Sequence, residues 1–127
     1  MARSSVSRRI LLVEDDEAIR ALVYEVLLDG GYDVHQARSG NEGLARVTEI
    51  RPDLILLDKL MPDGDGTAFA REYRARKGPH APIVALSAAA DAADWAGQIG
   101  AAAYVGKPLD IDDLLGVVKA GLAKNGP

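Results

Sequence analysis

Hydrophobic positions along this chain fall into two alternating patterns. Short aliphatic runs, such as 10–13 and 54–57, are typical of strands buried on both faces of a parallel sheet. Between them lie segments such as 17–29, where apolar residues recur at i, i+3, i+4, i+7 and i+8 and predict an amphipathic helix. The pattern predicts strands at 10–13, 32–37, 54–58, 82–87 and 103–105, and helices at 17–29, 39–49, 65–76, 91–99 and 110–122.

Five strand–helix units in this order predict an α/β fold, a doubly wound five-stranded parallel sheet with helices on both faces. Right-handed crossovers leave few strand orders, of which 2-1-3-4-5, the flavodoxin-like order, is the commonest for five strands. A capping box of Ser39 with Glu42, and the cap residue Asp110, mark two helix starts. We expect one domain over 9–123, a flexible N-terminal tail at 1–8 and a C-terminal tail at 124–127.

Composition narrows the possible functions. The chain has 127 residues, enough for one domain to bury a core, and no cysteine for a disulfide, a thiolate zinc site or a nucleophile. Its net charge of −4 argues against a surface for nucleic acid or anionic membrane. Its apolar runs are far shorter than the roughly 20 residues of a spanning helix. Its basic start lacks the apolar segment of a signal peptide, so we expect a cytoplasmic protein.

Acidic residues follow the two central strands of the predicted sheet. Glu14, Asp15 and Asp16 come after the first strand, and Asp58 ends the third. The ends of these strands meet where the chain direction reverses, which is where open α/β sheets bind ligands. Converging carboxylates repel one another unless a divalent cation lies between them. A site rich in oxygen, without His or Cys, suits Mg²⁺ better than zinc.

Two further polar groups follow the neighbouring strands. Ser87 ends the fourth strand and Lys107 follows the fifth. A carboxylate, a hydroxyl, an ammonium group and a hard cation around one point are the parts of a phosphoryl-transfer site. Asp58 is the candidate nucleophile, because a carboxylate can take a phosphoryl group covalently.

Four segments, each at the end of a predicted strand, together resemble the receiver domain of response regulators, the phosphate-accepting module of two-component signalling. They are residues 10–15, 56–64, 86–88 and 100–109, and the similarity extends from about residue 9 to residue 122. The resemblance implies a phospho-acceptor that takes part in its own phosphorylation, rather than an enzyme that turns over a separate substrate. The short tails favour a stand-alone regulator, and a receiver module of a hybrid kinase is the alternative.

The resemblance also implies a role for each acidic residue. Asp58 would be phosphorylated and would also bind Mg²⁺. Asp15 would bind the ion directly, Glu14 would act through water, and the main-chain carbonyl of Leu60 would complete the ligands from the protein. Asp16 is left as a helix cap.

The remaining groups of the resemblance respond to the phosphoryl group. Lys107 would pair with it, and the Ser87 hydroxyl would bond one of its oxygens. Tyr104 corresponds to the family's switch aromatic, whose ring turns inward when that hydroxyl moves. The Lys107–Pro108 bond is expected to be cis.

Partners follow from the same resemblance. A histidine kinase or a histidine phosphotransferase would pass its phosphoryl group to Asp58. The modified protein would then present a face formed by the fourth helix, fifth strand and fifth helix to a downstream target protein, or relay the group onward. It would be a monomer or a phosphorylation-dependent dimer. The sequence names neither the kinase, the target nor the pathway.

Two other functions fit single motifs only. Residues 63–67 match the Asp-x-Asp-x-Thr motif of haloacid-dehalogenase-type phosphatases, but that motif should directly follow a strand, and here the strand ends five residues earlier. Turn chemistry with Asp65 as a cap explains the segment better. A flavodoxin-like nucleotide or flavin binder would need a Ser/Thr/Gly-rich first turn, whereas residues 14–17 are all acidic.

Apolar residues near the site bear on how long a phosphoryl group would last. In the family, the positions held here by Leu60 and Ala89 influence the access of water to the aspartyl phosphate. With no polar group at either position to orient water, we predict slow self-dephosphorylation. His35 and His80 lack partners at ligand spacing, and Trp95 is expected to pack along its helix.

Overall fold

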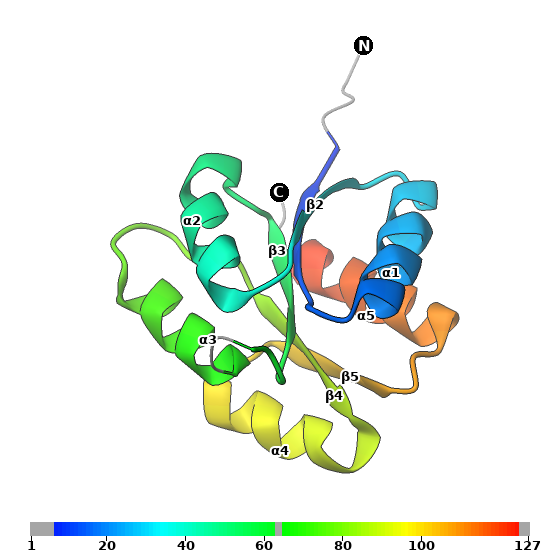
Figure 1. The fold of residues 1–127 in the computed structure, drawn as a ribbon. Helices are drawn as coiled ribbons and strands as arrows, with labels where there is room; N and C mark the ends of the chain where they lie inside the picture. Colours follow the sequence, from blue (N-terminus) through cyan, green and yellow to red (C-terminus); the bar gives the residue numbers. More distant parts are fainter. Residues whose placement is uncertain (1–6, 63–64, 125–127) are drawn as a thin grey trace.

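The computed structural model describes residues 7–62 and 65–124, and in this part of the chain strands and helices alternate strictly (Figure 1). The strands are β1 (Arg9–Val13), β2 (Asp33–Ala37), β3 (Leu54–Asp58), β4 (Ile83–Ala88) and β5 (Ala103–Lys107). The helices are α1 (Glu17–Asp29), α2 (Gly40–Ile50), α3 (Gly66–Ala75), α4 (Ala89–Ile99) and α5 (Ile111–Lys124). All strands are parallel in the order β2-β1-β3-β4-β5, which confirms the predicted fold.

Alternate residues of the central strands face two separate hydrophobic layers. Leu11, Ile55 and Leu57 point to the side covered by α2, α3 and α4. Leu12 and Leu56 belong to the layer on the other side, with residues of α1 and α5. Figure 1 shows α1 and α5 together on that side of the sheet. Because both faces are covered, β3 is buried along its whole length.

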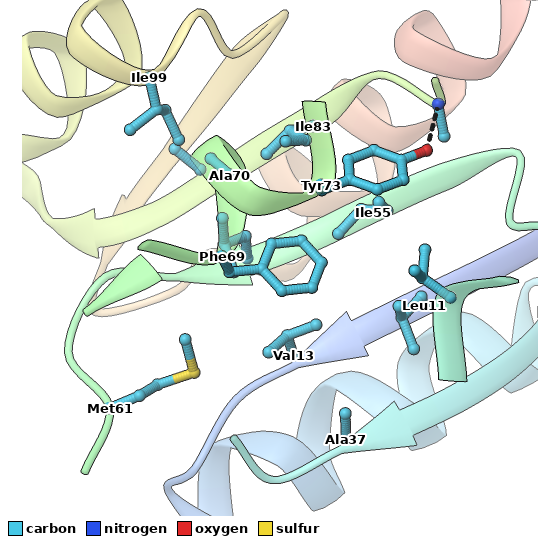
Figure 2. Close-up of a cluster of buried hydrophobic side chains, with 14 of the residues drawn as sticks. Leu11, Val13, Ala37, Ile55, Met61, Phe69, Ala70, Tyr73, Ile83 and Ile99 are labelled. Carbon is cyan, nitrogen blue, oxygen red and sulfur yellow. Dashed lines mark hydrogen bonds between the residues drawn. The ribbon is translucent and has the colours of Figure 1, made fainter. Parts of the chain in front are cut away.

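Aromatic residues of α3 and α4 fill the first of these layers beneath the site. Figure 2 shows Phe69 and Tyr73 of α3 lying over the strands, and their rings are stacked with centroids 5.9 Å apart. The Tyr73 hydroxyl accepts a 2.7 Å hydrogen bond from the Ala81 amide, which ties α3 to the start of β4. The fully buried Trp95 of α4 donates to the Thr67 hydroxyl of α3 over 2.9 Å, so its indole packs into the core against α3 and not, as predicted, along its own helix.

Most predicted boundaries agree with the structure within a residue or two. Three boundaries differ by two residues: β5 extends to Lys107 rather than ending at 105, α4 begins at Ala89 rather than Asp91, and α5 ends at Lys124 rather than 122. Gly106 and Lys107 continue the pairing with β4, although neither residue belongs to an aliphatic run. Ala89 is a strong helix former and starts α4 without any side-chain cap.

The predicted caps are confirmed where the structure describes them. Ser39, Asp65 and Asp110 each accept a hydrogen bond from a backbone amide two or three residues ahead. Positions 63 and 64 of the phosphatase-like motif lie outside the described residues. Among residues 7–62 and 65–124, no helix is both long and apolar enough to cross a membrane.

Candidate functional site

Three carboxylates meet at the carboxyl ends of β1 and β3. Asp58 is the last residue of β3, and Glu14 directly follows β1, where its amide continues the sheet by donating to the Ala37 carbonyl over 3.0 Å. Carboxylate oxygens of Glu14, Asp15 and Asp58 all lie within 4.8 Å of one another. Glu14 is 0% and Asp58 4% exposed, whereas Asp15 is open to solvent. The sheet thus brings together the acidic residues that the sequence analysis selected, apart from Asp16.

Lys107 reaches into this cluster from the end of β5. Its Nζ donates to Asp58 Oδ1 over 2.6 Å and to Glu14 Oε1 over 3.1 Å. Burial alone would lower the pKa of Lys107, but the hydrogen bond with Asp58 and the charges of Glu14 and Asp58 raise it above 10.5. The ammonium group therefore stays charged at neutral pH and partly offsets the repulsion between the carboxylates. The next peptide bond, Lys107–Pro108, is cis, as predicted.

The two buried carboxyl groups hold their protons more tightly than a carboxyl group in water. Burial, together with the nearby charge of Asp58, raises the pKa of Glu14 from 4.5 to about 7, although Lys107 acts in the opposite direction. Burial is also the main cause that raises the pKa of Asp58 above 3.8. Both shifts mean that the protein without a cation accommodates these negative charges poorly.

The loop after β1 is held by contacts that leave Asp16 outside the cluster. The Asp16 carboxylate caps α1 by accepting from the Ile19 amide over 2.9 Å, as predicted. The Asp16 amide donates to Glu14 Oε2 over 3.1 Å. Arg20, which the sequence analysis missed, donates to the carbonyl oxygens of Glu14 and Asp15 over 3.0 and 3.3 Å. Its position one turn into the helix after the acidic run was the only signal for it.

Ser87, the residue before the last in β4, is buried beside this acidic cluster. Its hydroxyl donates to Asp91 Oδ2 over 3.1 Å, and the same oxygen accepts from Lys59 Nζ over 2.7 Å. Asp91 and Lys59 are further residues that the sequence analysis did not select. Lys59 lies within the segment 56–64 but was given no role there, and Asp91 lies outside the four segments. Their contact joins residues 32 positions apart.

The acidic cluster, Lys107, Ser87, Asp91 and Lys59 line one open hollow of about 620 Å³ at the carboxyl edge of the sheet. Leu60 also lines it and is 73% exposed. Tyr104 of β5 is 49% exposed, so its ring lies outside the core, and it does not line this hollow. His35 and His80 lie elsewhere: their ring nitrogens contact the Asp33 carboxylate at 3.3 Å and the Arg76 carbonyl at 2.8 Å.

The donor set fits a hard divalent cation. Three carboxylates offer oxygen ligands within reach of one ion, and the described hollow contains neither His nor Cys. The raised pKa values of the buried pair indicate that an added positive charge would be favourable there. Because the site is open on one side, water and a phosphate oxygen could complete the coordination that Mg²⁺ requires.

Comparisons with known proteins agree on one family. The family model of the response regulator receiver domain matches residues 10–119. The chain is 37% identical over 123 residues to the DNA-binding response regulator MtrA of Mycolicibacterium smegmatis, which covers 95% of this chain but 53% of that protein. It therefore spans about half the length of this relative.

Two solved structures of similar size share the fold. A putative response regulator from Chloroflexus aurantiacus superposes with a TM-score of 0.84 at 32% identity, covering 93% of this chain and 99% of that one. The chemotaxis response regulator CheY4 of Vibrio cholerae gives a TM-score of 0.83 at 28% identity, covering 91% of this chain and 99% of that one.

Proposed function

Because the chain belongs to the response-regulator receiver family, whose members accept a phosphoryl group, we propose that Asp58 is the acceptor in this protein. The observation that carries the proposal is the position of the Asp58 carboxylate, at the end of the central strand, between two further carboxylates and 2.6 Å from the Lys107 ammonium group. Lys107 bonds two carboxylates of the cluster, those of Glu14 and Asp58, and of these two residues only Asp58 lies on β3.

The reaction is a transfer between two side chains. An oxygen of the ionised Asp58 carboxylate attacks the phosphorus of a phosphohistidine, the O–P bond forms, and the N–P bond breaks with its electron pair left on the histidine nitrogen. Lys107 stabilises negative charge on the phosphoryl oxygens. Asp15, Glu14, Asp58 and the Leu60 carbonyl would hold Mg²⁺, which supplies further charge stabilisation when bound.

The response to phosphorylation involves the neighbouring strands. We propose that the Ser87 hydroxyl bonds a phosphoryl oxygen and that Tyr104, now half exposed, turns inward. The surface formed by α4, β5 and α5 would then be the output face that meets a target protein. Tyr104 on β5 belongs to this surface in the unphosphorylated structure.

The partners follow from the chemistry of the donor. The family is phosphorylated by histidine kinases, so we propose a histidine kinase or a histidine phosphotransferase as the source of the phosphoryl group, in the cytoplasm. The comparison with MtrA, of which the chain covers about half, leaves a stand-alone regulator and a receiver module of a longer protein, such as a hybrid kinase, as the two forms of the proposal.

Intact-mass spectrometry tests the acceptor. The protein is incubated with acetyl phosphate, with and without Mg²⁺, beside an Asp58→Asn variant and an Asp94→Asn variant that alters an exposed carboxylate of α4. We expect the mass of one phosphoryl group in the wild type and in Asp94→Asn, only with Mg²⁺, and none in Asp58→Asn. Equal gain by the Asp58→Asn variant would refute the assignment.

A further inference from the structure

A cluster of three side chains beside the acceptor is not explained by the proposed function. Asp91, in the first turn of α4, accepts hydrogen bonds from Lys59 and Ser87 on the same oxygen, Oδ2, over 2.7 and 3.1 Å. Lys59 directly follows the acceptor Asp58, and Ser87 is the penultimate residue of the neighbouring strand β4. All three residues line the same hollow as the acidic cluster.

This cluster conflicts with the role proposed for Ser87. A serine hydroxyl has one hydrogen, so it cannot donate to Asp91 and to a phosphoryl oxygen at the same time. The bonds from Lys59 and Ser87 lower the pKa of Asp91, so this carboxylate is a charged and strong acceptor at neutral pH. Phosphorylation therefore has to draw the hydroxyl away from an existing partner.

The same contacts hold the beginning of α4. Ala88 occupies the N-cap position and provides no side-chain hydrogen bond. Asp91, three residues later, is joined through its carboxylate to the ends of both β3 and β4. When Lys59 and Ser87 leave Asp91, the first turn of α4 loses both bonds.

We propose that Asp91 is a positioning residue that holds the Ser87 hydroxyl and the Lys59 ammonium group in the unphosphorylated protein, so that a phosphoryl group on Asp58 must compete with the Asp91 carboxylate for both. The inference rests on the proposed role of Asp58. Asp91 itself does not touch the phosphoryl group. It lowers the affinity of the hollow for that group, and its release is the first step that loosens α4.

Removing Asp91 should therefore tighten the binding of a phosphoryl group. The partly exposed Lys59–Asp91 ion pair and the hydrogen bond from Ser87 to the Asp91 carboxylate both have to break. Together they change the affinity for a phosphoryl group on the order of fivefold to tenfold. Beryllium trifluoride, a non-covalent phosphoryl analogue, measures this affinity without the transfer step. Calorimetric titration with this anion in excess Mg²⁺ is the test, on the wild type and on Asp91→Ala, Asp91→Asn and Asp94→Asn.

A variant that lacks both the Lys59 ammonium group and the Ser87 hydroxyl separates positioning by Asp91 from simple charge repulsion between Asp91 and the phosphoryl analogue. We expect Asp91→Ala to bind the analogue about five to ten times more tightly than the wild type, and Asp91→Asn to show a smaller gain, because its amide oxygen can still accept from Ser87. Asp94→Asn should behave as the wild type. In a Lys59→Gln/Ser87→Ala background, Asp91→Ala should bring no gain.

The outcomes distinguish this inference from the function on which it rests. If the wild type binds the analogue and Asp91→Ala binds it equally or more weakly, the inference is wrong and the assignment of Asp58 stands. If the gain persists in full in the Lys59→Gln/Ser87→Ala background, repulsion rather than positioning causes it, and the inference is also wrong. If the wild type neither binds the analogue nor gains a phosphoryl group from acetyl phosphate, both proposals fall.

Discussion

Raising the pH should destabilise the metal-free protein, because its buried Glu14 carboxyl group must lose a proton. The pKa of Glu14 rises from 4.5 in water to about 7 in the fold. Between these two values the folded state binds more protons than the unfolded state, so the free energy of unfolding falls as the pH rises. The stabilising contribution is complete below pH 4.5 and is lost above about pH 7.

The size of the effect follows from the shift. One pKa unit corresponds to about 1.4 kcal/mol, so the whole contribution of Glu14 is about 3 kcal/mol, of which about 2 kcal/mol is lost between pH 5.5 and pH 8. The raised pKa of Asp58 acts in the same direction. The lowered pKa of Asp91 affects stability only below 3.8, and the raised pKa of Lys107 only above 10.5, so neither interferes in this window.

Urea unfolding at pH 5.5 and pH 8 in the presence of a chelator measures this loss, with the fluorescence of the buried Trp95, the single tryptophan, as the probe. Glu14→Gln removes the titrating group at nearly constant shape, so it should lose much less stability over this range. Glu25→Gln, an exposed position on α1, is the matched control and should behave as the wild type.

Added Mg²⁺ should remove most of the loss at pH 8, because an ion bound only by the folded state stabilises it. A wild-type stability that is constant or rises from pH 5.5 to pH 8, or an unchanged slope in Glu14→Gln, would show that burial of this carboxyl group does not have the effect described.

Three further predictions concern individual residues. Asp58→Asn should weaken Mg²⁺ binding without abolishing it, since two carboxylates remain, and a calorimetric titration with undetectable binding would contradict this. The aspartyl phosphate should persist far beyond seconds at 25 °C, because Leu60 and Ala89 offer no side-chain polar group to orient water. Leu60→Asn should shorten its lifetime. Mass spectrometry measures the decay, and a phosphoryl group lost within seconds from the wild type would refute the prediction. Gly66→Ala should destabilise the fold by roughly 1–3 kcal/mol, because its new Cβ would lie 2.5 Å from the Asp58 carbonyl oxygen. Gly97→Ala is the matched control: its Cβ would have nothing within 4 Å, so it should stabilise α4 by roughly 0.5–1 kcal/mol. Similar urea midpoints for the two variants would argue against this close approach.

The order of strands and helices could be read from the sequence because hydrophobic periodicity is a local property. The aliphatic run at 54–57 is apolar at every position, as expected for a strand buried on both faces of a parallel sheet. The apolar residues of α1 recur at helical spacing, so they lie on one face of the helix, and that face packs against the sheet. Right-handed crossovers then leave few ways to order the strands. Since all strands of a parallel sheet end at one edge, Glu14, Asp58, Ser87 and Lys107 were expected to meet there, and the structure brings them together.

Only the tertiary structure decided how those groups are paired. The sequence placed Ser87 beside the site but gave no sign that its hydroxyl is bound to Asp91, or that Lys59 turns to that same carboxylate rather than to its neighbour Asp58. Arg20 was missed for the same reason. Hydrogen bonds made by a side chain depend on the direction in which it leaves its own element, and packing across the sheet sets that direction.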